Sequence, residues 1–99
     1  MSENYAYPLA DDWSTDEIIT VTHFYQLVEN AYELSQGVLI SELTAAYRAF
    51  KTIVTSKSQE KQLDKAFGKV TGYSIYLTMK QSRETTKKSV KMSTGRDAR

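Results

Sequence analysis

The feature that most constrains this chain is a row of apolar side chains recurring every three or four residues between positions 15 and 35. Its members are Ile18, Val21, Tyr25, Val28 and Tyr32. This spacing is typical of an amphipathic helix with one buried face. Directly before it, Ser14 and Glu17 form the S-x-x-E pattern of a capping box, in which each side chain accepts a hydrogen bond from the other residue's backbone amide. The sequence therefore predicts a first helix over residues 15–35, with Gly37 as a natural stop.

Two further amphipathic segments are expected over residues 39–54 and 56–70. Ser56 begins an S-x-x-Q box that opens the second of them. Gly72 can end this third helix, since glycine readily adopts the left-handed conformation found there. The aromatic side chains that we expect to be largely buried on these three helices are Tyr32, Tyr47, Phe50 and Phe67.

Ser74 can cap a fourth helix, with Tyr76 and Met79 facing inward. From residue 85 onward the sequence is polar and has few of the apolar residues that order a chain. No alternating β-type pattern stands out. We therefore predict an all-α domain over residues 14–84, a compact array of three main helices plus a fourth. An extended N-terminal arm (1–13) packs on it, and a basic, flexible, disordered tail (85–99) follows.

Composition argues against several classes of function. The 99 residues include no Cys, one His and four Gly, so thiolate chemistry is absent and a phosphate-binding glycine loop is not expected. His23 is interpreted as a solvent-facing or core-edge residue rather than a metal ligand. The acidic residues around the first helix start are interpreted as capping groups rather than an acid–base pair. We expect no enzyme activity, no cofactor and no metal.

The N-terminal residues have neither the basic nor the apolar region of a signal peptide, and no apolar run approaches the roughly 20 residues of a membrane span. A chain without Cys also suits a reducing compartment. We therefore expect a cytoplasmic protein that does not enter the membrane.

The sign of the charge changes once along the chain. Residues 1–42 hold eight acidic side chains and no Lys or Arg, whereas residues 43–99 hold all thirteen basic side chains and four acidic ones. Opposite charges attract, so either the halves neutralise each other or each faces a partner of opposite charge. We expect the first arrangement, with the basic third helix lying against Glu29 and Glu33 of the first.

A candidate interaction surface lies on the third and fourth helices. Basic side chains recur there at every fourth position, which places them along one slowly winding stripe. The candidate residues are Lys57, Lys61, Lys65, Lys69, Tyr73, Tyr76, Lys80 and Arg83. The tyrosines are interpreted as core-edge residues, or alternatively as part of an aromatic groove for a partner peptide.

Several short motifs, in the same order, resemble the UPF0223 family of low-GC Gram-positive bacteria. They are Tyr7-Pro8-Leu9, Trp13-Ser-Thr-x-Glu17-Ile18-Ile19, Val28-Glu29-x-Ala31-Tyr32-Glu33, Tyr47-Arg48-x-Phe50-Lys51, Ser56-Lys57, Glu60-Lys61-Gln62-Leu63 and Gly72-Tyr73-Ser74-x-Tyr76. The resemblance spans about residues 5–80. It implies a small all-α fold and supplies no catalytic residues. Thr55 stands where the family usually has Pro, and the tail after Ser82 lies outside the shared pattern.

Two functions from different classes remain open. The first is a non-enzymatic accessory or interaction protein, monomeric or homodimeric, with an unknown protein partner. The alternative is a weak, sequence-independent nucleic-acid binder that uses the lysine stripe and the basic tail. We favour the first, because nucleic-acid-binding domains are usually strongly basic with interleaved aromatic residues. Here the formal net charge is +1, and no apolar residue separates Met79 from Val90.

Overall fold

The computed structural model describes residues 6–94, and this part of the chain contains four helices and two short strands. The helices are α1 (Thr15–Glu33), α2 (Ile40–Ile53), α3 (Lys57–Thr71) and α4 (Ile75–Glu84). The strands are β1 (Val38–Leu39) and β2 (Ser89–Val90), and they pair antiparallel. The prediction of an all-α fold with three main helices and a fourth is confirmed.

Serine side chains fix the start of three of these helices. The predicted capping box is present: Ser14 Oγ accepts from the amide of Glu17 at 3.1 Å, and Glu17 Oε1 accepts from the amide of Ser14 at 2.9 Å. Ser56 and Ser74 each accept a hydrogen bond from the amide three residues later, at 3.2 and 2.9 Å. Each bond satisfies a backbone donor that the helix leaves unpaired.

Glycine conformation accounts for one of the two predicted helix ends. Gly72 caps α3 in the left-handed conformation, with a φ of 83°, as predicted. α1 ends at Glu33, two residues earlier than expected, and Gly37, with a φ of 72°, lies in the turn before β1.

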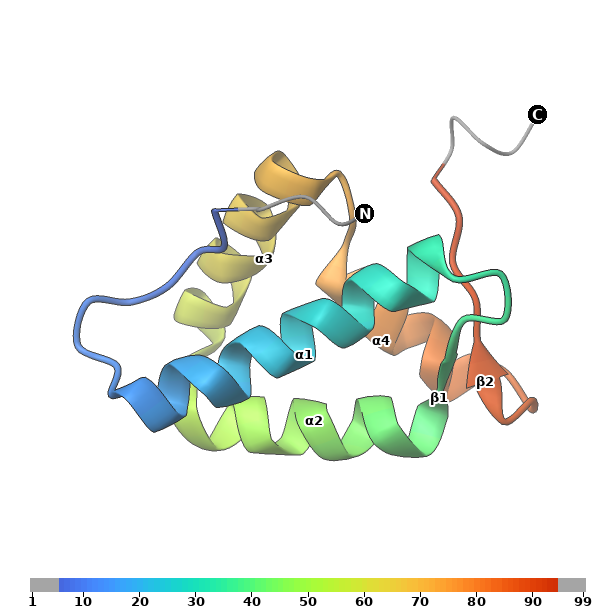
Figure 1. The fold of residues 1–99 in the computed structure, drawn as a ribbon, viewed down its shortest axis with the longest axis horizontal. Coiled ribbons are helices and arrows are strands. Elements are labelled where there is room, and N and C mark those ends of the chain that lie inside the picture. The colour runs from blue at the N-terminus through green and yellow to red at the C-terminus, as the bar shows by residue number, and fades with distance from the viewer. Residues whose placement is uncertain (1–5, 95–99) are drawn as a thin grey trace.

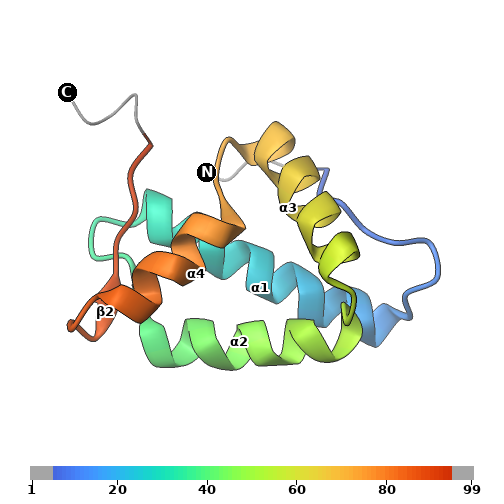
Figure 2. The ribbon, with the colours of Figure 1, turned by 180° about the vertical axis from the view of Figure 1, so that it is seen from behind.

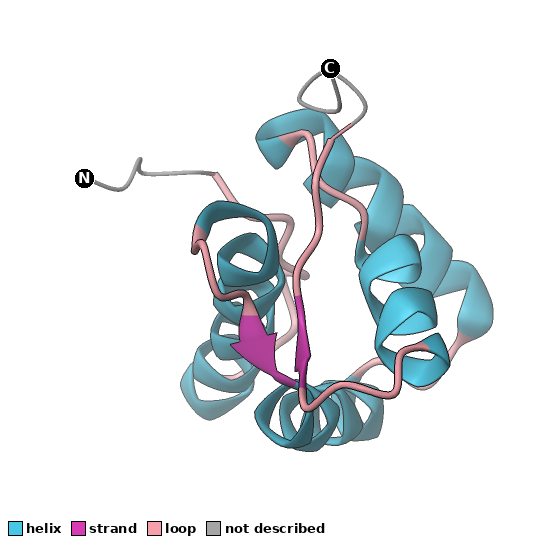
Figure 3. Cartoon of the chain, turned by 90° about the vertical axis from the view of Figure 1, so that its right-hand side faces the viewer, coloured by secondary structure: helices cyan, strands magenta, loops and turns pink. Residues whose placement is uncertain are grey.

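The helices are arranged around α1. Helices α1 and α2 run antiparallel beside each other (Figure 1). Helix α4 lies behind α1 in this view and contacts it. Seen from behind, α3 and α4 diverge from the turn that joins them, and α2 runs across the open side (Figure 2). The β1–β2 pair closes one end of the molecule (Figure 3).

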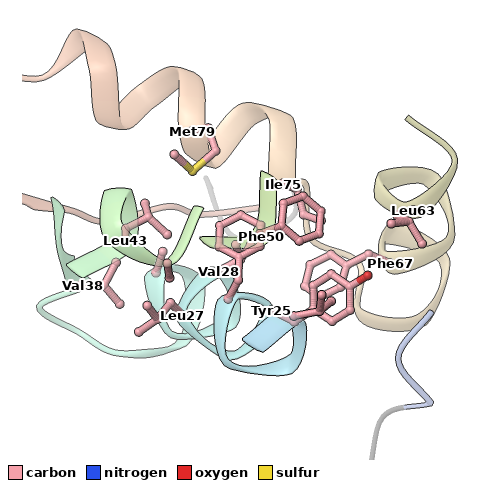
Figure 4. Close-up of a cluster of buried hydrophobic side chains, with 14 of the residues drawn as sticks. Tyr25, Leu27, Val28, Val38, Leu43, Phe50, Leu63, Phe67, Ile75 and Met79 are labelled. Carbon is pink, nitrogen blue, oxygen red and sulfur yellow. The ribbon is translucent and has the colours of Figure 1, made fainter. Parts of the chain in front are cut away.

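Aromatic rings from three helices form the centre of the core (Figure 4). The ring centroids of Phe24 and Phe50 are 4.8 Å apart, and those of Tyr25 and Phe67 are 5.0 Å apart. All four side chains are fully buried, which confirms the prediction for Phe50 and Phe67. Burial of rings of this size supplies much of the hydrophobic free energy of a small domain.

Tyr32 and Tyr47 are less deeply buried than Phe50 and Phe67, and they pack against the edge of the core. Their hydroxyl groups explain the difference, because a phenol at the core edge can bury its ring while its oxygen meets a polar partner. Tyr32 Oη accepts from the amide of Ser74 at 3.2 Å, and Tyr47 Oη donates to Glu60 Oε2 at 2.8 Å.

Residues 6–13, the described part of the expected N-terminal arm, pack on the domain. The ring of Tyr7 lies 5.2 Å from that of Tyr25 and 6.4 Å from that of Phe67, so it fills space between α1 and α3. The Tyr7 hydroxyl donates to Glu29 Oε1 at 2.7 Å, and the Tyr25 hydroxyl donates to the carbonyl of Pro8 at 2.8 Å. Residues 1–5 of the predicted arm lie outside the described residues.

Residues 85–94 correct the prediction of a disordered tail. Val90 pairs with Val38 across the two strands and is 1% exposed. The amide of Met92 donates to the carbonyl of Ala31 at 2.7 Å. The tail composition is polar, but Val90 lies in the hydrophobic core and Met92 packs against it. The last predicted tail residues, 95–99, lie outside the described part of the chain.

Candidate functional site

The predicted interaction residues lie on α3, on α4 and on the turn between them. Those with exposed side chains are Lys57, Lys61, Lys65, Lys69, Tyr76, Lys80 and Arg83. Tyr73 is half buried. Tyr76 was expected to face inward, but it is 62% exposed, and its neighbour Ile75 takes the inward position at 3% exposed.

A hollow of about 300 Å³ lies between α3 and α4, and we call it the α3–α4 groove. Its apolar and aromatic lining residues that are buried or half buried, which we call its floor, are Tyr47, Ile75 and Met79. Its exposed rim consists of Lys57, Lys61, Tyr76 and Arg83. The carboxylates of Glu60 and Asp64 complete the lining. The groove therefore combines an apolar floor with a rim that carries three cations.

A second, more open hollow of about 540 Å³ continues the α3–α4 groove toward the α3–α4 turn. The two hollows share Lys61, Asp64 and Tyr76. Lys65 adds a fourth cation at this end, and Gly68 contributes no side chain, so the wall formed by α3 is low there. The two hollows together follow the facing surfaces of α3 and α4.

Asp64 holds the two walls of the groove together. Its two carboxylate oxygens accept hydrogen bonds from the backbone amides of Ile75 at 2.9 Å and Tyr76 at 3.2 Å. These amides belong to the first turn of α4, where a carboxylate also meets the positive end of the helix dipole. Asp64 therefore stabilises the start of α4.

Glu60 also has partners within the protein, at the other end of the groove. It accepts from the Tyr47 hydroxyl at 2.8 Å, and Lys51 Nζ lies 2.5 Å from its Oε1. Burial alone raises the pKa of Glu60, but the hydrogen bonds from Lys51 and Tyr47 outweigh it and leave that pKa lowered. Burial and the bond to Glu60 raise the pKa of Tyr47 to about 12.

The structure does not bring all the predicted residues to this site. Lys69 and Lys80 line neither hollow. The ring of Tyr73 stacks on that of Tyr32 with centroids 4.3 Å apart, and its hydroxyl donates to Glu33 Oε2 at 2.7 Å. Tyr73 therefore ties the α3–α4 turn to α1, which favours the core-edge interpretation for this residue.

The expectation that the lysine stripe lies against Glu29 and Glu33 of α1 was wrong. Within residues 6–94, none of the four lysines of α3 forms an ion pair with Glu29 or Glu33. Glu29 is buried under the arm with Tyr7, and Glu33 lies at the far end of α1 with Tyr73. The stripe therefore faces solvent.

Sequence reasoning missed the floor of the groove as a site. Tyr47 was assigned to the core of α2, and Met79 to the inner face of α4. The groove exists because α3 and α4 diverge over α2, and no local pattern specifies that angle. The interactions of Asp64 with the start of α4 carried no signal either, since they join residues on different elements.

A third hollow, of about 400 Å³, lies beside the tail and is lined by Lys87, Lys88 and Lys91 among other polar residues. Lys91 Nζ donates to the carbonyl of Tyr32 at 2.6 Å, in the last turn of α1. That turn has no basic residue of its own, so Lys91 supplies the positive charge that favours a helix C-terminus. We interpret Lys91 as a structural residue.

Two general properties bear on the choice of function. Among the described residues, no helix combines the length and apolar character needed to cross a membrane. Residues 6–94 also contain no cluster of three or more His, Cys, Asp or Glu side chains arranged to hold a metal ion.

Comparison with known proteins gives a consistent result. The model of an uncharacterised protein family, UPF0223, matches residues 4–91. A UPF0223 protein of Streptococcus uberis is 53% identical over 87 residues, which cover 88% of this chain and 92% of that relative. One of Bacillus cytotoxicus is 49% identical over 89 residues, covering 89% of this chain and 98% of the relative. The sequence is thus similar to these proteins over nearly their whole length.

Proposed function

This chain belongs to UPF0223, an uncharacterised protein family, and we propose that it is a small, non-enzymatic protein-binding module that uses the α3–α4 groove. The observation that carries the proposal is the composition of the groove. Its lining includes Tyr47, Tyr76, Met79 and Arg83, and Tyr, Met and Arg are among the residue types enriched at protein interfaces. Most of the other large apolar side chains are buried in the core or packed against it.

Further support comes from the rigidity of the walls. Asp64 bonds α3 to the first turn of α4, and Glu60 joins α3 to α2 through Tyr47 and Lys51. A surface that is ordered before a partner arrives loses less conformational entropy on binding. We place the protein in the cytoplasm, since a chain without Cys suits a reducing compartment.

Site-specific cross-linking tests the proposal. A photoreactive phenylalanine analogue replaces Tyr76, and in a control variant it replaces Ile19, which is on α1 and equally exposed at 61% against 62%. Both variants are irradiated in an extract of the native host, with and without nuclease. We expect protein adducts from position 76 that survive nuclease and are absent from position 19. Adducts of equal yield from both positions, or none from position 76, would contradict the proposal.

Nucleic-acid binding stays as a second candidate, because the lysine stripe faces solvent rather than α1. The groove argues against it as the main function, since its apolar floor offers no partner to a phosphate backbone. We expect random DNA or RNA to bind more weakly than about 10⁻⁵ M at physiological salt. Titration of labelled oligonucleotides tests this, with the triple variant Lys61→Ala, Lys65→Ala, Lys69→Ala as control. Submicromolar binding that falls steeply with salt and is lost in that variant would reverse the ranking.

A further inference from the structure

The chemistry of the α3–α4 groove also indicates what kind of segment it accepts, an inference that rests on the function proposed above. Ile75 and Met79 are 3% and 5% exposed, so the deepest part of the groove is apolar and already desolvated on one side. A volume of about 300 Å³ is at the lower limit of the range for small-molecule pockets. It suits one large apolar side chain, and Met79 can adapt its shape around such a group.

The carboxylates and the cations around this apolar centre differ in whether they already have partners within the protein. The two carboxylates of the lining, Glu60 and Asp64, already accept hydrogen bonds from the protein itself. The cations of the rim, Lys57, Lys61 and Arg83, are exposed and make no ion pair within residues 6–94. A partner therefore meets exposed cations, whereas the carboxylate oxygens already have hydrogen-bond donors within the protein.

The cations also have a definite arrangement. Lys57 comes from the start of α3 and Arg83 from the end of α4, and both line the same hollow. Lys61 is common to both hollows, and Lys65 lies in the second one. Positive charge therefore occurs at both ends of the groove, on either side of the apolar floor.

We propose that the α3–α4 groove binds an acidic peptide segment of a partner protein. One large apolar side chain of the segment inserts between Tyr47, Ile75 and Met79. Carboxylates on either side of it pair with the cations of the rim. Charge complementarity of this kind speeds association and excludes partners of the wrong sign, and the buried apolar anchor supplies most of the affinity.

Selection from a random peptide library displayed on phage tests this proposal, with the wild-type protein as bait. We expect the selected peptides to share one aromatic or large aliphatic residue flanked by Asp or Glu. Synthetic peptides of the selected sequence, labelled for fluorescence anisotropy, then provide the probe. Replacing their Asp and Glu by Asn and Gln should weaken binding by about tenfold or more, and added salt should do the same.

Two matched variants locate the site. Lys61→Glu reverses a charge that both hollows share, and Lys69→Glu makes the same change on the same helix outside both hollows. Lys61→Glu should weaken binding of the selected peptide about tenfold, and Lys69→Glu should leave it within about twofold. Thermal melts of both variants show whether the fold is retained. An equal effect of the two substitutions would overturn the assignment of the site.

The possible failures can be told apart. Selected peptides that bind in the groove but are neutral or basic would overturn the inference about charge and leave the docking function intact. Peptides whose binding is unaffected by Lys61→Glu and by Tyr76→Ala would overturn the groove as a docking site. A third outcome is a labelled single-stranded oligonucleotide that binds more tightly than any selected peptide and loses its binding in Lys61→Glu. That result would assign the groove to nucleic acid rather than to an acidic peptide.

Discussion

The hydroxyl of Tyr7 in the arm donates a 2.7 Å hydrogen bond to Oε1 of Glu29 on α1, which ties the arm to this helix. Glu29 is 7% exposed, and within residues 6–94 its other oxygen, Oε2, has no hydrogen-bond partner. Burial raises the pKa of Glu29, the bond from Tyr7 opposes that rise, and the nearby charge of Glu33 adds to it. The folded protein therefore binds a proton at this site more tightly than the unfolded chain does.

The first prediction concerns the pH dependence of stability. Because the pKa of Glu29 is raised from 4.5 on folding, its contribution to stability is complete below that value and is lost as the pH rises through the folded pKa. Glu29→Gln does not titrate and still offers an amide oxygen to Tyr7. At pH 7 the variant should therefore be more stable than wild type, and near pH 4 the two should converge.

Urea unfolding at several pH values measures this effect. Glu60 has a lowered pKa and an opposite pH dependence, but it is present in both proteins, so it cancels in the difference between their curves. Curves that remain parallel from pH 4 to pH 7 would show that Glu29 titrates normally in the folded protein.

The second prediction concerns the aromatic core. Phe50 is fully buried and its ring lies 4.8 Å from that of Phe24 and 6.3 Å from that of Tyr25. Phe50→Ala should reduce the free energy of unfolding by roughly 3–5 kcal/mol, because it removes apolar contacts and leaves a cavity. Tyr76→Ala, on the exposed rim, should change it by less than about 1 kcal/mol. Chemical denaturation compares the two, and similar losses would mean that Phe50 does not occupy the centre of the core.

The third prediction separates backbone strain from steric contact at two glycines. Gly37 and Gly72 both have a positive φ, so alanine is strained at either position. A Cβ at Gly37 would also lie 2.1 Å from the carbonyl oxygen of Val90, whereas one at Gly72 has nothing within 4 Å. Gly72→Ala should cost about 1–2 kcal/mol, and Gly37→Ala about 3 kcal/mol or more, since it must also displace β2. Thermal melts of the two variants measure these losses of stability. Equal losses would show that β2 does not lie against Gly37.

The fourth prediction concerns the segment after α4. Val90 is 1% exposed and pairs with Val38. Val90→Ala should cost about 2 kcal/mol, because two buried methyl groups are lost at about 0.8 kcal/mol each and a small cavity remains. Lys88→Ala, two residues earlier and exposed, keeps its backbone hydrogen bond to Ile40 and should change stability little. A melting temperature unchanged by Val90→Ala would restore the interpretation of this segment as an undocked tail.

The elements that the sequence predicted correctly are those whose signals are local. Ser14 and Glu17 are three residues apart, and the apolar face of α1 repeats within single turns, so a short window contains the whole pattern. The β1–β2 pair joins Val38 to Val90, and two-residue strands are too short to show an alternation. Their existence depends on contacts between distant segments, which a single sequence does not reveal.

The candidate site was predictable only in part, for the same reason. The exposed lysines of α3 were predictable because they lie on one face of one helix. The groove was not, because its floor combines Tyr47 of α2 with Ile75 and Met79 of α4. The capping of α4 by Asp64 shows the difference well: Ser74 is a recognisable local cap, whereas Asp64 reaches the same helix end from another element.

The hydrogen bond from Ile40 to the carbonyl of Lys88 has a consequence for synthesis of the protein on the ribosome. The start of α2 has no side-chain cap, and among the described residues its first amide donates only to this later segment. A nascent chain that has not yet released residues 88–92 from the exit tunnel therefore lacks a partner for Ile40, for Val38 and for the carbonyl of Ala31. Since a domain completes its fold only when such distant contacts can form, α1 and α2 should stay protease-sensitive in stalled chains that present residues up to Glu84, and become resistant once Met92 emerges.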